Sequence, residues 1–261
     1  MVTLSPYKRL FLEMHLHMKA YWKRPATWFR WHRWLGYIVV LQFLAWIFGG
    51  LFFALVPFQT WVKGKDLVQK PNDEVIVQWE QLAPALHTLN QSNGKLVAFQ
   101  SIVTAQGPAL RLQYQAANGN KTVLTDMRGQ VLQAPNQNHI EALAKRIYRG
   151  EGQLHSVNRF EKLPNRLGIV KELAGRENLW QAQFNDALDT RLFFDATTGE
   201  FITQRTNTWV WYDFFWRLHI MDYGDGEDFN NTLLRLASIF AVLMMVTGVV
   251  LSIRNLLRKR L

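Results

Sequence analysis

The stretch WLGYIVVLQFLAWIFGGLFFALVPF, residues 34–58, decides the fold. Its 25 residues are apolar apart from Gln42. As an α-helix it would measure about 37 Å, and the hydrocarbon core of a bilayer is about 30 Å thick. A helix that is apolar on every face over this length rarely belongs to a soluble core. We therefore predict a transmembrane helix at 34–58. It is too long for a signal peptide, and a leader of 33 residues precedes it.

A second apolar run near the other end predicts a second transmembrane helix at 233–254. Its continuous apolar part is 236–253, and Arg235 lies near its start. The two spans would enclose a water-exposed segment at 59–232.

The net charge of +10 comes from the two ends of the chain. The leader 1–33 has seven Lys or Arg residues and one Glu, and four basic residues follow residue 253, whereas 59–232 is nearly neutral. The positive-inside rule places such basic ends in the cytoplasm of a bacterium and the central segment in the periplasm, with the spans in the inner (cytoplasmic) membrane. The basic leader is expected to be an amphipathic helix on anionic lipid, and the tail 255–261 to contact lipid as well. This distribution argues against a nucleic-acid partner.

The chain has no cysteine, which excludes disulfides, thiolate metal sites and cysteine nucleophiles. It also lacks a glycine-rich phosphate loop, a Gly-x-Ser-x-Gly elbow and a His-Glu-x-x-His pair.

The central segment alternates apolar and polar residues, as strands do, with turns between them. A helical spacing precedes each run of strands, so we expect two units, 59–135 and 136–208, each a helix plus an antiparallel sheet. The expected helices are 75–89 and 138–148, and the expected strands and hairpins are 97–103, 110–114, 122–132, 154–160, 179–184 and 192–202.

Both closing hairpins have an aspartate followed by a glycine, Asp126 with Gly129 and Asp195 with Gly199. The aspartate can accept hydrogen bonds from amides of its own turn, and the glycine supplies a positive φ. We interpret these aspartates as turn-forming residues.

Several motifs resemble those of known membrane proteins. The hairpin Phe194–Glu200 is similar to the Asp-x-x-Thr-Gly-Glu turn of PepSY domains. The stretches His32–Gly36, Leu218-His219 and Val246–Leu251 resemble motifs of the PepSY-associated transmembrane helix family. The resemblance implies an α+β membrane protein, with two transmembrane helices flanking a periplasmic domain of two PepSY-like units.

The resemblance also implies a function in bacterial iron acquisition or respiratory electron transfer. Some family members are ferric-siderophore reductases that bind haem b through histidines at transmembrane helices. On that basis His32 and His219 are the candidate axial ligands. Family reductases have four spans, and this chain has two.

One haem is not expected to use both histidines of one chain. His32 would lie near the inner face and His219 near the outer face, about 30 Å apart, whereas two axial nitrogens lie about 4 Å apart. A homodimer, or another membrane subunit, would have to supply the second ligand of each site. The alternative is that His32 is an interfacial anchor and His219 a hydrogen-bonding residue of the outer connector.

The outer connector 209–232 is aromatic at its start and acidic at its end. Its oxygen ligands Asp222, Asp225, Glu227 and Asp228 suit a hard cation such as Ca²⁺ or Fe³⁺. The alternative is a solvated turn that caps the second span.

These observations favour an electron-transfer subunit linked to iron or siderophore reduction, with a periplasmic redox or iron-siderophore partner. Whether such a subunit is itself part of a ferric reductase enzyme stays open. The alternatives are a non-catalytic PepSY interaction or regulatory module anchored in the membrane, and a structural subunit of a larger membrane complex.

Overall fold

The computed structural model describes residues 25–71, 83–84, 87, 95–116 and 119–258. The chain forms two compact units, and each is considered by itself below. The first comprises residues 1–51 and 215–261, and the second comprises residues 52–214. The expected leader helix, most of the expected helix at 75–89 and the last three residues of the tail lie outside the described residues.

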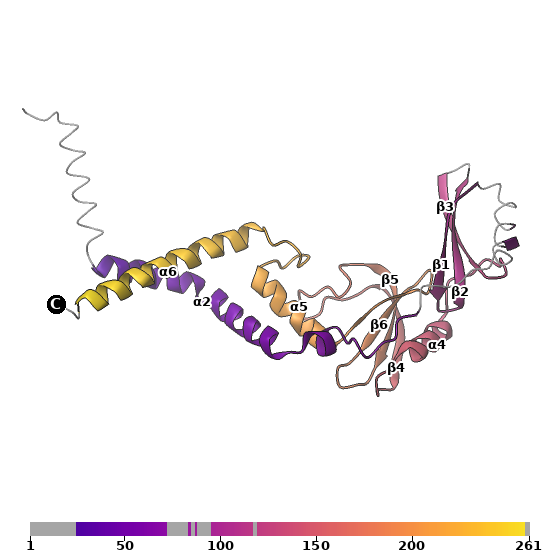
Figure 1. Ribbon diagram of the computed structural model, residues 1–261, viewed down its shortest axis with the longest axis horizontal. Coiled ribbons are helices and arrows are strands. Elements are labelled where there is room, and N and C mark those ends of the chain that lie inside the picture. Colours follow the sequence, from indigo (N-terminus) through magenta and orange to yellow (C-terminus); the bar gives the residue numbers. More distant parts are fainter. Residues whose placement is uncertain (1–24, 72–82, 85–86, 88–94, 117–118, 259–261) are drawn as a thin grey trace, which may run out of the picture. The chain divides into compact units, whose positions relative to one another are not determined.

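Two long apolar helices are found where the sequence predicts spans (Figure 1). Helix α2 covers Pro25–Leu55 and helix α6 covers Thr232–Arg258. Within them, 30 and 26 residues qualify as candidate membrane spans, and little of either is buried. Large apolar side chains such as Leu41 and Met245 are well exposed, which suits a lipid environment. The chain is thus a membrane protein with two candidate spans.

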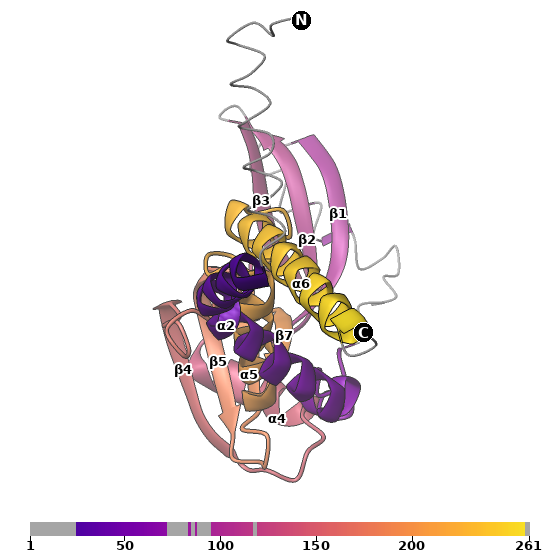
Figure 2. The same cartoon turned by 90° about the vertical axis from the view of Figure 1, so that its left-hand side faces the viewer.

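The first sheet consists of three antiparallel strands in the order β1-β2-β3 (Figures 1 and 2). The strands are β1 (Lys95–Thr104), β2 (Gly107–Ala116) and β3 (Gly119–Asp126). Leu110 and Leu112 of β2 are fully buried and form a small core with Val123 and Met127. The strands predicted at 97–103 and 110–114 are therefore confirmed and prove longer than expected.

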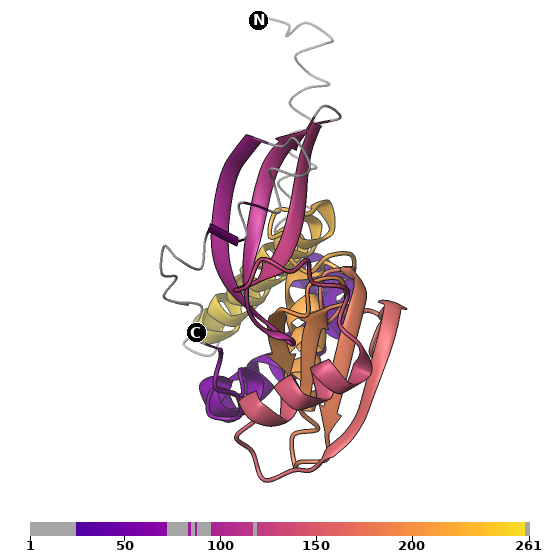
Figure 3. The same ribbon diagram turned by 90° about the vertical axis from the view of Figure 1, so that its right-hand side faces the viewer.

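The second sheet has four antiparallel strands in the order β4-β5-β6-β7. Helix α4 (Gln137–Ile147) lies across one face of this sheet (Figure 3). Its apolar stripe, which includes Ile140 and Leu143, packs against Phe184, Leu192 and Phe194 in the larger core. The strands are β4 (Leu154–Lys162), β5 (Glu177–Phe184), β6 (Arg191–Asp195) and β7 (Phe201–Arg205).

The two aspartate–glycine turns have the predicted hydrogen bonds. The carboxylate of Asp126 accepts from the amides of Arg128 and Gln130, and the carboxylate of Asp195 accepts from those of Thr197 and Thr198. Gly129 and Gly199 have φ angles of 79° and 74°. The structural interpretation of both aspartates is confirmed.

The second of these turns also joins the two sheets. The amide of Ala105, which follows β1, donates to the carbonyl of Gly199 at 3.0 Å. Next to it, Arg111 of β2 forms an ion pair with Glu200. The turn at Asp195 and Gly199 therefore contributes both to its own hairpin and to the contact between the two sheets.

Two short elements next to the spans were not predicted. A π-helical turn η1 covers Phe58–Val62, inside the range expected to be the end of the first span and the start of the first PepSY-like unit. Helix α5 covers Asn207–Ile220, so the expected aromatic connector at 209–232 begins as a helix of 14 residues. Its aromatic side chains are spread around the helix and leave no polar face for the sequence pattern to detect.

Candidate functional site: two histidines at the helical unit

His32 lies on α2 and contacts α6 of the same unit. Its Nδ1 atom is 3.0 Å from Oγ1 of Thr247 and 3.2 Å from the carbonyl oxygen of Met244. Thr247 is buried and His32 is half-buried. The contact brings together two of the stretches that resemble family motifs, which are 215 positions apart in the chain.

The hydrogen bonds around Thr247 indicate which nitrogen of a neutral His32 ring carries the proton. The Thr247 hydroxyl donates to the Met244 carbonyl at 2.8 Å, so its only proton is already in use. Both contacts of His32 Nδ1 are then satisfied only if Nδ1 carries a proton and donates. We assign this tautomer, which leaves the lone pair of a neutral ring on Nε2.

Gly248 gives the imidazole room. A Cβ atom added at this glycine would lie 3.2 Å from Cε1 of His32. On the same pair of helices, a Cβ at Gly36 would lie 3.7 Å from the methyl carbon of Met244. Small residues therefore allow α2 and α6 to approach at the level of His32.

His219 is the penultimate residue of α5, and side chains of other segments hold the backbone around it. Gln42 donates to the carbonyl of Leu218 at 2.7 Å, and Trp46 donates to the carbonyl of His219 itself at 2.8 Å. The last carbonyl, that of Ile220, accepts from the Asn231 amide at 2.9 Å. These bonds satisfy carbonyls that a helix end leaves without partners.

The imidazole of His219 is exposed, and its ring centre is 6.2 Å from that of Trp46. His219 thus lies beside Trp46, a residue of α2 that follows His32 by 14 positions. At 1.5 Å per residue, about 21 Å of helix separates the two levels. The structure does not bring the two histidines together.

The acidic connector after α5 is organised around Asp222. Its carboxylate accepts hydrogen bonds from the amides of Gly224, Gly226, Glu227 and Asp228 at 2.8–3.0 Å. Hydrogen bonding of the carboxylate, with the amide of Asp228 first, lowers the pKa of Asp222. Both of its oxygens are therefore engaged by the loop itself.

The buried guanidinium of Arg217 holds the same loop from inside. It donates to the carbonyls of Gly224 and Asp225 at 2.8 and 3.0 Å. In the part of the chain that the structure describes, no group of three or more His, Asp or Glu side chains could hold a metal ion. A cation on Asp222, Asp225, Glu227 and Asp228 gains no support from this geometry and stays a prediction.

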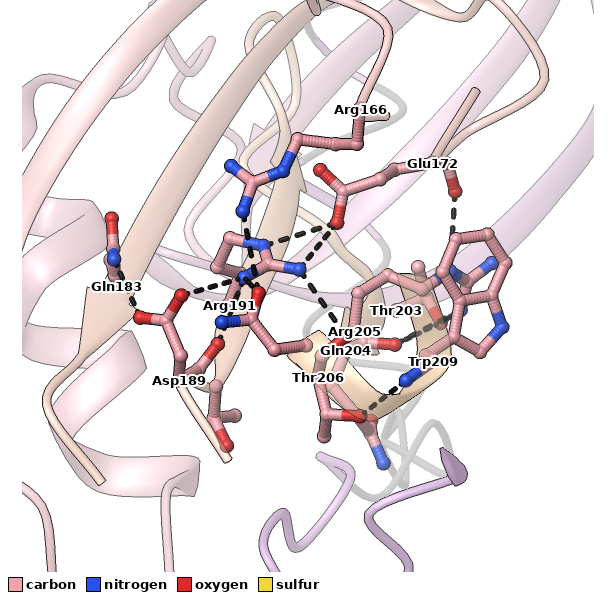
Figure 4. Close-up of polar contacts among 12 residues, drawn as sticks. Arg166, Glu172, Gln183, Asp189, Arg191, Thr203, Gln204, Arg205, Thr206 and Trp209 are labelled. Atoms are coloured by element: carbon pink, nitrogen blue, oxygen red, sulfur yellow. Dashed lines mark hydrogen bonds and ion pairs between the residues drawn. The ribbon is translucent and has the colours of Figure 1, made fainter. Parts of the chain in front are cut away.

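The second compact unit, residues 52–214, is called the central unit below. It contains a buried ion pair that the sequence did not indicate. The guanidinium of Arg191, on β6, donates to Glu172 and to Asp189 (Figure 4). It also reaches the side chain of Asn207 and the carbonyl of Thr206, at the start of α5. Arg191 begins a strand whose next three residues are apolar, and only the folded strand shows that it faces away from α4.

Comparison with known proteins assigns the chain to a family. No curated protein and no solved structure matches it. A match to the PepSY-associated TM region family covers residues 29–261, which include His32, the whole middle region, the second candidate span and all but the first three residues of the first. The chain belongs to the PepSY-associated TM region family.

Proposed function

We propose that this protein is a haem b-binding subunit of an electron-transfer system in the bacterial inner membrane, linked to reduction of iron or iron-siderophore complexes. The observation that carries the proposal is the hydrogen bonding of His32. Metal-ligating histidines nearly always donate the other ring N–H to a carbonyl, carboxylate or water, which fixes the ring. His32 does so through Nδ1, toward Thr247 and Met244.

The surroundings of His32 fit a haem in three respects. Nε2 of His32 keeps its lone pair, the ring is only half-buried, and Gly248 places no side chain over it. The imidazole of His219 is exposed while its backbone is held by Trp46. A bound haem supplies one-electron chemistry. The contribution of this chain is to orient each imidazole and to leave Nε2 of His32 available.

The separation of the two histidines supports one haem at each level. About 21 Å of helix lies between them, and the two axial nitrogens of a haem are about 4 Å apart. Each site then needs a second axial ligand from another chain, either a second copy or a different membrane subunit. Two haems at two depths would lead electrons across the membrane.

The charge distribution supports the orientation. The basic ends of the chain would be cytoplasmic and the two sheets periplasmic, where they would meet a redox or iron-siderophore partner. The absence of cysteine makes this simple to test. An impermeant maleimide added to intact spheroplasts should label His155→Cys and leave Leu261→Cys unlabelled until the cells are lysed. The reverse pattern would overturn the orientation.

Absorption spectra test the haem proposal. The full-length protein, purified from cells supplied with haem precursors, should show a Soret band that shifts on reduction with dithionite. If the two sites are separate, His32→Ala and His219→Ala should each remove about half of the haem. His155→Ala is the matched control, because His155 is an exposed histidine of β4.

A missing Soret band, or unchanged haem content in the double variant of His32 and His219, would overturn the proposal. The non-catalytic alternatives, an anchored PepSY interaction module or a structural subunit, would then remain. Loss of all haem in each single variant would contradict two separate sites.

A further inference from the structure

The central unit contains a basic cleft that the proposed function does not use. Its volume is about 720 Å³, and it lies between the segment that starts at η1 and the region of β7 and the first turn of α5. Four cationic side chains line it, and no acidic residue does: Lys63, Lys65, Lys70 and Arg205. Phe58 and Trp209 add aromatic surface.

The cationic side chains of the cleft have no ion-pair partner within the described part of the chain. Among the described residues, no carboxylate forms an ion pair with any of the three lysines, and Lys63 instead lies over the ring of Phe58 at 5.3 Å. Arg205 donates to the carbonyls of Glu172 and Gln204 and to the hydroxyl of Thr203, which are all neutral groups.

Arg205 is held in place by its surroundings. Its guanidinium lies 4.3 Å from the centre of the Trp209 ring (Figure 4). Burial lowers the pKa of Arg205, and the carboxylates of Glu172 and Asp213 oppose this effect. The Glu172 carboxylate is already bound by Arg191. A half-buried cation in this position gains from an additional anion.

The walls of the cleft are tied to each other. The Thr206 hydroxyl donates to the carbonyl of Trp61 at 2.7 Å, and the Gln204 amide donates to the carbonyl of Lys63 at 3.0 Å. The segment after the first span is thereby fixed to β7. One wall of the cleft is formed by β7 and the start of α5, and these bonds hold the segment with the lysines against it.

The cleft is close to the membrane boundary along the chain. Lys63 follows the last residue of the first candidate span, Leu55, by eight residues, a reach of at most about 28 Å. Phe58 and Trp61 lie between them and are exposed, as aromatic residues at the headgroup level are.

We propose that this cleft binds a phosphate-bearing anion, with the headgroup of an anionic phospholipid as its ligand. Arg205 would bind the phosphate oxygens through Nη2, since Nε and Nη1 already donate to the three neutral groups named above, and the lysines would add charge. The aromatic surface of Phe58 and Trp209 would contact the glycerol part. This site is independent of haem, so its test does not depend on the function proposed above.

Hydrogen exchange gives a local test. The full-length protein is reconstituted in nanodiscs of phosphatidylcholine, with and without phosphatidylglycerol, and exchange is followed in peptides covering residues 59–70. Phosphatidylglycerol should slow exchange there by about tenfold near saturation. A third arm adds inorganic phosphate to the pure phosphatidylcholine nanodiscs and shows whether a soluble anion is enough.

The triple variant Lys63→Gln/Lys65→Gln/Lys70→Gln should lose the protection. All three side chains are exposed, so the fold should be kept, and circular dichroism checks this. The matched control Lys8→Gln/Lys19→Gln/Lys23→Gln removes the same charge from the leader and should keep the protection.

Protection that requires phosphatidylglycerol supports the lipid headgroup as the ligand. Protection by inorganic phosphate alone supports the phosphate site and assigns it to a soluble anion. No protection in either arm, or equal protection in the wild type and the cleft variant, overturns the proposal.

Discussion

The Nη2 atom of Arg191 lies 2.7 Å from the Oε1 atom of Glu172, and their side chains are only 1% and 3% exposed. Removal of one partner from a buried ion pair costs about 3–5 kcal/mol, because the other charge remains buried without a partner. We expect Arg191→Met to lower the free energy of unfolding of the central unit by this amount. Chemical denaturation of the full-length protein in detergent, followed by circular dichroism, measures it.

The double variant Arg191→Met/Glu172→Leu separates the charge from the packing. It should recover most of the loss, because neither buried charge is left alone. The exposed pair of Lys145 and Glu141 on α4 is the control, and Lys145→Ala should cost about 0.5 kcal/mol or less. If the double variant is no more stable than Arg191→Met, the loss does not come from an unpaired charge.

Gly248 and Gly50 form a matched pair of glycines in the two spans. A Cβ at Gly248 would press on His32, whereas a Cβ at Gly50 would meet no heavy atom within 4 Å. Gly248→Ala should therefore destabilise the contact of α2 with α6 by about 1–3 kcal/mol. Gly50→Ala should cause no loss. Thermal unfolding in detergent compares the two variants, and equal melting temperatures would contradict the crowding at His32.

A comparison of alanine substitutions at Gly199 and Gly168 distinguishes backbone strain from steric crowding. Both have a positive φ, 74° and 79°. A Cβ at Gly199 would lie 3.0–3.2 Å from Ala105 and Pro135, whereas one at Gly168 would meet nothing within 4 Å. Gly168→Ala should cost about 1 kcal/mol from strain alone. Gly199→Ala should cost about 1–3 kcal/mol more.

The same chemical denaturation measures both glycine variants. A similar loss in the two would mean that the turn does not press on Ala105. The joining of the two sheets through Gly199 would then contribute little to the stability of the unit.

Tyr148 makes the stability of the central unit sensitive to alkaline pH. Burial, together with the hydrogen bond from its hydroxyl to Asp186 at 2.7 Å, raises the pKa of Tyr148 to about 12. The unfolded chain loses this proton near pH 10, before the folded protein does. The contribution of Tyr148 to the free energy of unfolding is thus fully present below about pH 10, and it is lost as the pH rises toward about 12.

A denaturation series between pH 8 and pH 12 should show this loss in the wild type, and Tyr148→Phe should show less of it. Tyr114→Phe is the control, because Tyr114 is a half-buried tyrosine on β2 of the other sheet. A wild-type slope equal to that of Tyr148→Phe would contradict the raised pKa.

Much of the fold follows from local sequence. Spans are predictable because the stretch from Trp34 stays apolar for longer than a soluble helix does. The hairpins are predictable because Asp195 and Gly199 define a turn through their own chemistry. Helix α5 could not be predicted this way, because the run from Trp209 to Trp216 has aromatic residues on most sides and no helical polar stripe.

For the candidate site, the sequence identified the residues but not the contacts between them. His32 and Thr247 both belong to stretches that resemble family motifs, yet their contact across 215 positions follows from the packing of two helices and not from any local pattern. The ion pair of Arg191 and Glu172 was missed for the same reason. No local pattern marks the basic residues of the cleft, because a strand 140 positions away supplies the other wall.

The hydrogen bond from Trp46 ends on the backbone carbonyl of His219, so it does not depend on the side chain at this position. A substitution at this position therefore keeps the hydrogen bonds to the carbonyls of α5, and it changes only the side chain and its ring contact with Trp46. Gln42 and Trp46 share one helix with His32, so a turn of that helix about its axis would shift both histidines in concert. Helix α2 would thus transmit a displacement at the level of one histidine to the level of the other.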